Sequence, residues 1–151
     1  MREKGTAAAF LVGMPAGVLL GLSIYTFGYA RGHSYLTDDP AACVNCHPMR
    51  EQYEGWIKSS HRRAAVCNDC HTPGDRLGKY TTKLLNGFSH SLAFTAGQFA
   101  DAIRIRGRNR AVTQASCNRC HQEILAAIGA GRHPREGVEC LDCHRDVGHA
   151  H

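Results

Sequence analysis

The seven residues Cys43-Val44-Asn45-Cys46-His47-Pro48-Met49 organise this chain more than any other part of it. In a Cys-x-x-Cys-His pattern, the two thiols can form thioethers with a haem and the adjacent histidine can ligate its iron. The pattern returns at residues 67–71, 117–121 and 140–144. The sequence therefore predicts four covalently attached c-type haems. The predicted thioether positions are Cys43, Cys46, Cys67, Cys70, Cys117, Cys120, Cys140 and Cys143.

Zinc binding is the alternative use of these cysteines. Cys46 and Cys67 enclose 20 residues, and Cys120 and Cys140 enclose 19, which are spacings that suit paired zinc knuckles. Zinc knuckles do not require a histidine directly after every second cysteine, whereas all four motifs have one. All eight cysteines of the chain fall in the motifs, so none is left for a structural disulfide. We therefore favour haem over zinc.

The formal net charge of +5 invites a nucleic-acid interpretation. Four haems, however, would add about eight propionates and four ferric centres, leaving a net charge near +1. The basic balance is thus better explained as compensation for haem carboxylates, and we expect no nucleic-acid partner.

Residues 6–30 carry no charged side chain and follow a short start with Arg2 and Lys4. As a helix they would span roughly 37 Å, enough to cross a bilayer. A cleaved signal peptide is the alternative, but the apolar run is long for one and no clear small-x-small cleavage site stands out. We expect residues 1–30 to be an uncleaved single-pass anchor in the cytoplasmic (inner) membrane, and residues 31–151 a tetrahaem cytochrome c domain in the periplasm.

A domain of about 120 residues with four haems cannot bury much of a conventional core. We expect the porphyrins to form the core, in a mainly α fold with extensive loops and little or no β structure. The uneven motif spacing suggests two dihaem halves, joined by a segment from Leu77 to about Arg106 that is mainly helical. Residues 106–110 would form a basic connection.

The iron ligands divide into proximal and distal candidates. His71, His121 and His144 are the proximal candidates of the last three motifs. In the first motif, Met49 lies two residues past His47 and on the same side of the ring, so either His47 binds the iron or Met49 replaces it.

A distal ligand cannot come from a residue too near its own motif, because the chain must pass around the porphyrin edge. His61 and His149 are therefore the best distal candidates, each for a haem other than that of its neighbouring motif. His133 is a weaker candidate, and His33 and His151 stay unassigned. With His61 and His149 used, two haems have no evident sixth ligand except His90 or His133.

The combination of anchor, four motifs in this spacing, Met49 and the ending Cys-His-Arg-Asp-Val-Gly-His at 143–149 resembles the NapC/NrfH family of membrane-anchored tetrahaem quinol dehydrogenases. Within that family it is most similar to the small subunit of cytochrome c nitrite reductase. The resemblance implies that Met49 ligates haem 1, whose other face stays open beside a quinol site. It also implies bis-His ligation of haems 3 and 4 with His61 and His149 as distal ligands, and a lysine from the catalytic subunit on haem 2.

In the family, a lysine and an acidic residue line the quinol site, and the matching positions here are Lys83 and His90. A histidine in place of the carboxylate is a departure from the family pattern. His90 can accept a quinol proton, since imidazole titrates in the right range, or it can ligate haem 1 and close the site. We take Lys83 and His90 as the candidate proton acceptors.

We therefore expect menaquinol oxidation at the outer face of the membrane, with electrons passing through four haems to a periplasmic multihaem reductase. The first choice of partner is the pentahaem catalytic subunit of nitrite reductase, which reduces nitrite to ammonia, in a hetero-oligomeric complex. The alternatives are a donor to another reductase, such as nitrate reductase, and a tetrahaem electron shuttle without a quinol site.

Overall fold

The computed structural model describes residues 2–99, 103–128 and 139–149. All regular elements in these ranges are helices, as expected. The chain divides into two compact units, Met1–Thr37 and Asp38–His151. Each is described here by itself.

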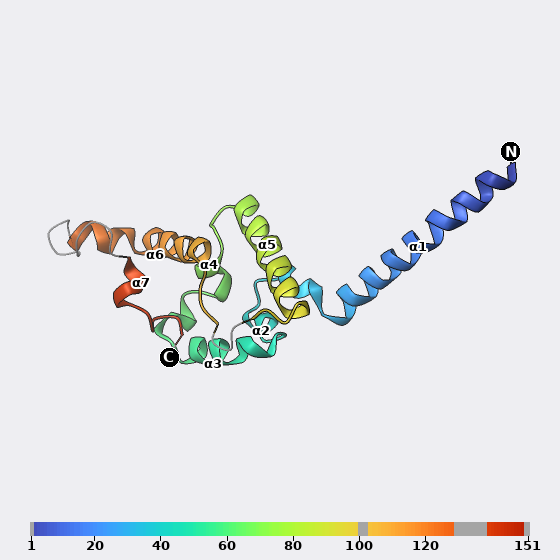
Figure 1. Cartoon of the computed structure of the whole chain (residues 1–151). Helices are drawn as coiled ribbons and strands as arrows, with labels where there is room; N and C mark the ends of the chain where they lie inside the picture. Colours follow the sequence, from blue (N-terminus) through green and yellow to red (C-terminus); the bar gives the residue numbers. More distant parts are fainter. Residues whose placement is uncertain (1, 100–102, 129–138, 150–151) are drawn as a thin grey trace. The chain divides into compact units, whose positions relative to one another are not determined.

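The first unit consists of one long helix and a short turn. Helix α1 (Arg2–Tyr29) runs without interruption through Pro15 (Figure 1). Its part from Ala9 to Tyr29 has a mean hydropathy of 1.8 and is long and apolar enough to cross a membrane. After α1, Arg31 adopts a left-handed conformation with φ 51°, and the 3-10 helix η1 (Gly32–Leu36) follows.

The second unit carries the first, second and fourth motifs on short helices and turns, and the third motif within the long helix α6 (Gly107–Ile128) (Figure 1). In chain order the elements are α2 (Pro40–Cys43), η2 (His47–Met49), α3 (Arg50–Lys58), η3 (Ser60–Arg63), α4 (Cys67–His71), α5 (Arg76–Thr95), α6 (Gly107–Ile128) and α7 (Cys140–Cys143). Helices α4 and α7 both pack against α6. The second, third and fourth motifs are thus gathered around one helix.

Aspartate side chains cap the starts of α2 and α5. Asp39 accepts a hydrogen bond from the backbone N–H of Ala41 at 2.9 Å, and Pro40 occupies the first turn of α2. Asp75 accepts from the N–H of Gly78 at 2.6 Å at the start of α5. These caps satisfy N–H groups that the helices leave unpaired.

The polypeptide of the described ranges has no buried hydrophobic side chain. Its buried side chains are polar instead: Thr72, Thr82, Lys83, Thr113 and Ser116. A chain of this size cannot stay compact on such contacts, because burial of apolar surface is the main stabilising term in folding. The finding agrees with the expectation that bound porphyrins supply the core.

Two segment boundaries differ from the prediction. The helix expected to reach about Arg106 ends at Thr95, two residues before Gly97 at φ 64°. The expected basic connection at 106–110 is largely the first turn of α6, which begins at Gly107. Residues 108–128 contain neither Gly nor Pro, so the helix continues unbroken through the third motif.

Candidate haem and quinol site

No disulfide joins any of the eight motif cysteines, all of which lie within the described residues. The second and fourth motifs share one local design, in which the aspartate between the cysteines caps its own helix. Asp69 accepts a hydrogen bond from the N–H of Val66 at 2.8 Å, and Asp142 accepts from the N–H of Glu139 at 3.0 Å. The later motif of each predicted dihaem half thus begins with the same cap.

The thiols of successive motifs lie close enough to influence one another. A hydrogen bond with Cys67 lowers the pKa of Cys43 to about 7, while the same bond and burial raise the pKa of Cys67. Burial raises the pKa of Cys70, with a further contribution from the charge of Cys117. Burial likewise raises the pKa of Cys117, to which Cys140 contributes. The attachment sites therefore neighbour one another in the order one, two, three, four.

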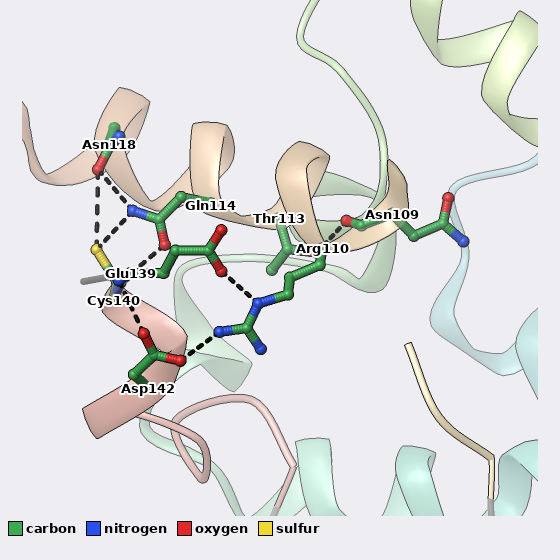
Figure 2. A network of polar contacts seen from close by, with 8 residues as sticks. All are labelled: Asn109, Arg110, Thr113, Gln114, Asn118, Glu139, Cys140 and Asp142. Atoms are coloured by element: carbon green, nitrogen blue, oxygen red, sulfur yellow. Dashed lines mark hydrogen bonds and ion pairs between the residues drawn. The ribbon is translucent and has the colours of Figure 1, made fainter. Parts of the chain in front are cut away.

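Side chains of α6 hold the fourth motif in place, as Figure 2 shows. Gln114 accepts a hydrogen bond from the N–H of Cys140 at 2.8 Å and donates one to its Sγ at 3.1 Å. Arg110 forms ion pairs with Glu139 and with Asp142, the latter at 2.5 Å. The Cys140 thiol is thus presented from one fixed position.

The third motif is tied to the second in a similar way. Arg119 donates a hydrogen bond to the carbonyl of Asp69 at 2.9 Å. A Cβ on Gly74 would lie 2.6 Å from Nη1 of Arg119, so the glycine gives the guanidinium room to pass.

Two pairs of histidines have ring-centre separations that match two imidazoles bound to one iron ion. The ring centres of His61 and His121 are 6.0 Å apart, and those of His71 and His149 are 5.9 Å apart. Two imidazoles on opposite sides of one metal place their ring centres about 6 Å apart, because each metal–nitrogen bond is about 2 Å and each ring centre lies about 1 Å behind its nitrogen. The ring planes cross at 72° in the first pair and 27° in the second.

The two distal candidates are oriented by backbone carbonyls. Nδ1 of His61 lies 3.1 Å from the carbonyl oxygen of Val147, and Nδ1 of His149 lies 2.9 Å from that of Gln52. An Nδ1–H donated to a carbonyl leaves Nε2 unprotonated and able to bind a metal. Burial, and then the charge of His149, lower the pKa of His71, which favours its neutral, metal-binding form.

The position of His149 differs from what the family resemblance implied. We expected bis-His ligation of haems 3 and 4, whereas His149 lies against His71 of the second motif. The chain turns back after His144 and brings His149 to the carbonyl of Gln52 in α3. The requirement that His149 serve a haem other than that of its neighbouring motif agrees with this position.

The remaining ligand candidates are placed less fully. His47 and Met49 share the 3-10 turn η2, where His47 is exposed and Met49 is partly buried. His144 is exposed. His133 and His151 lie outside the described residues, and His33 belongs to the first unit.

The candidate quinol residues occupy one face of α5. Lys83 is buried, and its charge contributes to the lowered pKa of the Cys43 thiol, so it lies within electrostatic reach of the first attachment site. Its Nζ donates a hydrogen bond to Asp38 at 3.1 Å. His90 lies two helical turns further, about 10 Å along the axis. Its side chain is exposed, yet partial desolvation, and then the charge of Arg106, lower its pKa.

Sequence reasoning missed Asp38. It lies 41 and 45 residues before the two lysines that it contacts, Lys79 and Lys83. A buried lysine needs a counter-charge, but a single sequence does not indicate which carboxylate supplies it.

Comparison with known proteins agrees with this arrangement. A family model described as the NapC/NirT cytochrome c family, N-terminal region, matches residues 3–151. The chain is 36% identical over 142 residues to the cytochrome c-type protein NrfH of Wolinella succinogenes, covering 87% of this chain and 80% of that protein. It is 30% identical over 113 residues to the cytochrome c nitrite reductase subunit NrfH of Nitratidesulfovibrio vulgaris, covering 75% and 69%.

The chain is also similar to a solved structure of an NrfH-containing complex. A chain in the crystal structure of the cytochrome c nitrite reductase NrfHA complex bound to the HQNO inhibitor is similar, with a TM-score of 0.63 and 28% identity over 93% of this chain and 90% of that chain. The motif cysteines without disulfides, the paired imidazoles and the lack of buried apolar side chains in the described ranges all fit covalently bound haem. The chain belongs to the NapC/NirT cytochrome c family.

Proposed function

We propose that this membrane-anchored redox protein oxidises menaquinol at the outer face of the cytoplasmic membrane and passes the electrons through four c-type haems to a cytochrome c nitrite reductase. The observation that carries the proposal is the buried Lys83, which is ion-paired with Asp38 and whose charge reaches Cys43 of the first attachment site. A pure electron shuttle has no need of a buried ammonium group there. The similarity to NrfH proteins and to the NrfHA complex supports the partner.

We assign the haem ligands from the histidine geometry. His71 and His149 would hold haem 2, and His61 and His121 would hold haem 3, because each pair is about 6 Å apart. Met49 is favoured over His47 on haem 1, since the thioether is partly buried and the imidazole is exposed.

With this assignment, haem 4 and not haem 2 is the haem whose sixth ligand is still to be identified. His144 would be the proximal ligand of haem 4, and either His133 or a lysine of the catalytic subunit would be its sixth ligand. The second choice would couple complex formation to the ligation of the last haem in the chain.

The haems accept one electron at a time, whereas a quinol supplies two electrons and two protons. The chain's own residues therefore have to handle protons near the first site. His90 is neutral near pH 7, because its pKa is lowered, and can take a proton at an imidazole nitrogen. Its exposure allows that proton to leave for water. The neighbour order of the thiols supports an electron route from haem 1 to haem 4.

Purification from solubilised membranes tests this function. We expect the chain to co-purify with a larger haem-stained subunit, and a menaquinol analogue to reduce its haems and support nitrite reduction. Reduction by dithionite but not by the quinol analogue would favour the electron-shuttle alternative. Co-purification with a nitrate reductase would redirect the proposal to that acceptor.

A further inference from the structure

The carboxylate of Asp38 lies at the centre of a cluster of polar side chains from α4 and α5. Oδ1 of Asp38 accepts hydrogen bonds from Asn68 at 2.6 Å and from Lys83 at 3.1 Å, and Oδ2 accepts from Lys79 at 2.5 Å. These partners come from two helices, α4 and α5. Asp38 therefore links the helix of the second motif to the helix that carries Lys83.

The two lysines of the cluster differ in their surroundings. The side chain of Lys83 is 8% exposed and that of Lys79 is 25% exposed. A buried ammonium ion is costly unless it is paired, so Lys83 depends on Asp38 more than Lys79 does. The ring of Tyr80, whose centre lies 5.8 Å from Nζ of Lys83, adds a cation–π contact to this amino group.

We propose that Asp38 is a positioning residue of the quinol site, which fixes Lys83 as an ammonium ion within electrostatic reach of the first attachment site. The inference rests on the proposed function and deepens it. Held in this way, Lys83 donates a hydrogen bond to a quinol oxygen and takes up no proton. His90 is then the proton acceptor, so the roles of the two candidate residues separate.

The reaction balances with this division of roles. Oxidation of one quinol releases two electrons and two protons, and a haem held by the first motif would accept the electrons one at a time. His90 takes each proton at an imidazole nitrogen and releases it to water before the next. The positive charge of Lys83 stabilises the quinolate oxygen that remains when the first proton departs.

Asp38 itself is unsuited to accept a proton from quinol. The hydrogen bond from Lys79 does most to lower its pKa to about 2, against the opposing effect of desolvation, and bonds from Lys83 and Asn68 add to the lowering. It stays a carboxylate at neutral pH and serves as a fixed negative charge.

Variants in the complete membrane-bound complex test the inference. We expect Asp38→Asn to keep four haems but to lower kcat/KM for a menaquinol analogue roughly tenfold or more, and Asp38→Glu to recover most of the loss. Asp39→Asn is the matched control, because it removes the same charge one residue away and asparagine still caps α2. It should stay within about twofold of the wild type.

A second pair of variants tests whether Lys83 acts as a fixed positive charge or as a proton acceptor. Arginine keeps the charge and does not deprotonate, so Lys83→Arg should retain more quinol oxidation than Lys83→Met by roughly tenfold or more. HQNO, the inhibitor bound in the similar NrfHA structure, provides a binding readout that does not depend on turnover. If HQNO occupies the proposed quinol site, Asp38→Asn should weaken its binding to the oxidised complex.

Equal kcat/KM and equal HQNO affinity in the Asp38→Asn and Asp39→Asn complexes would overturn the role of Asp38. Loss of activity in Lys83→Arg with HQNO affinity retained would make Lys83 a proton acceptor and overturn its role as a fixed charge. A wild-type complex that does not oxidise quinol would instead refute the proposed function.

Discussion

Replacement of His149 by alanine tests the ligand assignment most directly. In the structure the ring of His149 lies 5.9 Å from that of His71, with an angle of 27° between their planes, whereas the other pair crosses at 72°. The relative orientation of two axial imidazole planes controls how the iron d orbitals split. The near-parallel pair should therefore give a rhombic low-spin ferric signal in electron paramagnetic resonance, and the near-perpendicular pair a much more anisotropic one.

His149→Ala should remove one axial ligand from one haem in four. We expect about a quarter of the iron to lose its bis-His low-spin signal, and the rhombic component to be the one that disappears, because the axial ligand set determines the electronic state of the iron. His61→Ala should instead remove the anisotropic component, and His33→Ala in the first unit should change neither. The measurement is the spectrum of the oxidised protein at matched haem content.

Two results would refute this reasoning. The first is an unchanged low-spin spectrum in His149→Ala. The second is loss of the anisotropic component in that variant, which would mean that His149 serves a haem other than the one held by His71.

Three further predictions follow from the site. His90→Gln should suppress menaquinol oxidation, measured as haem reduction by a quinol analogue, because the proposed proton acceptor is removed while all four haems stay bound. Asp38 should contribute about 1 kcal/mol to the free energy of unfolding, after allowance for its half-exposed position. Because its pKa in the folded protein is lowered, this contribution is present above pH 3.8 and is lost as the pH falls from there to about 2. Acid titration of unfolding measures the loss. Gln114→Ala removes two hydrogen bonds to Cys140, so it should destabilise the position of the fourth motif by roughly 1–2 kcal/mol. The fraction of chains with four haems, measured by mass spectrometry, should fall. Replacement of the exposed Gln122 by alanine is the control.

Each of these has a contrary outcome. Unchanged quinol turnover in His90→Gln would remove the acceptor role from that residue. Equal acid sensitivity of the wild type and Asp38→Asn would show that the carboxylate adds no stability. A full haem count in Gln114→Ala would mean that the fourth motif holds its position without the contacts shown in Figure 2.

The attachment chemistry of this protein was predictable because it is local. Five consecutive residues suffice to recognise a haem motif, and an uncharged run of 25 residues suffices to predict the long apolar helix that became α1. The mainly α fold, and the lack of buried apolar side chains in the part of the chain that the structure describes, also followed from chain length and the four motifs. The prediction was wrong about two helix boundaries, since α5 ends at Thr95 and not near Arg106, and α6 already begins at Gly107. The second error arose because a basic run resembles a solvated connection whether or not it is helical.

The pairing of these local parts was decided only by the tertiary structure. The sequence by itself identified His61 and His149 as distal candidates, but which proximal histidine each one faces depends on contacts 60 and 78 residues apart, between His61 and His121 and between His71 and His149. The same holds for Asp38, whose partners Lys79 and Lys83 lie on a helix 41 and 45 residues further along the chain. Neither periodicity nor spacing records such long-range contacts, because they depend on how loops return the chain to an earlier segment.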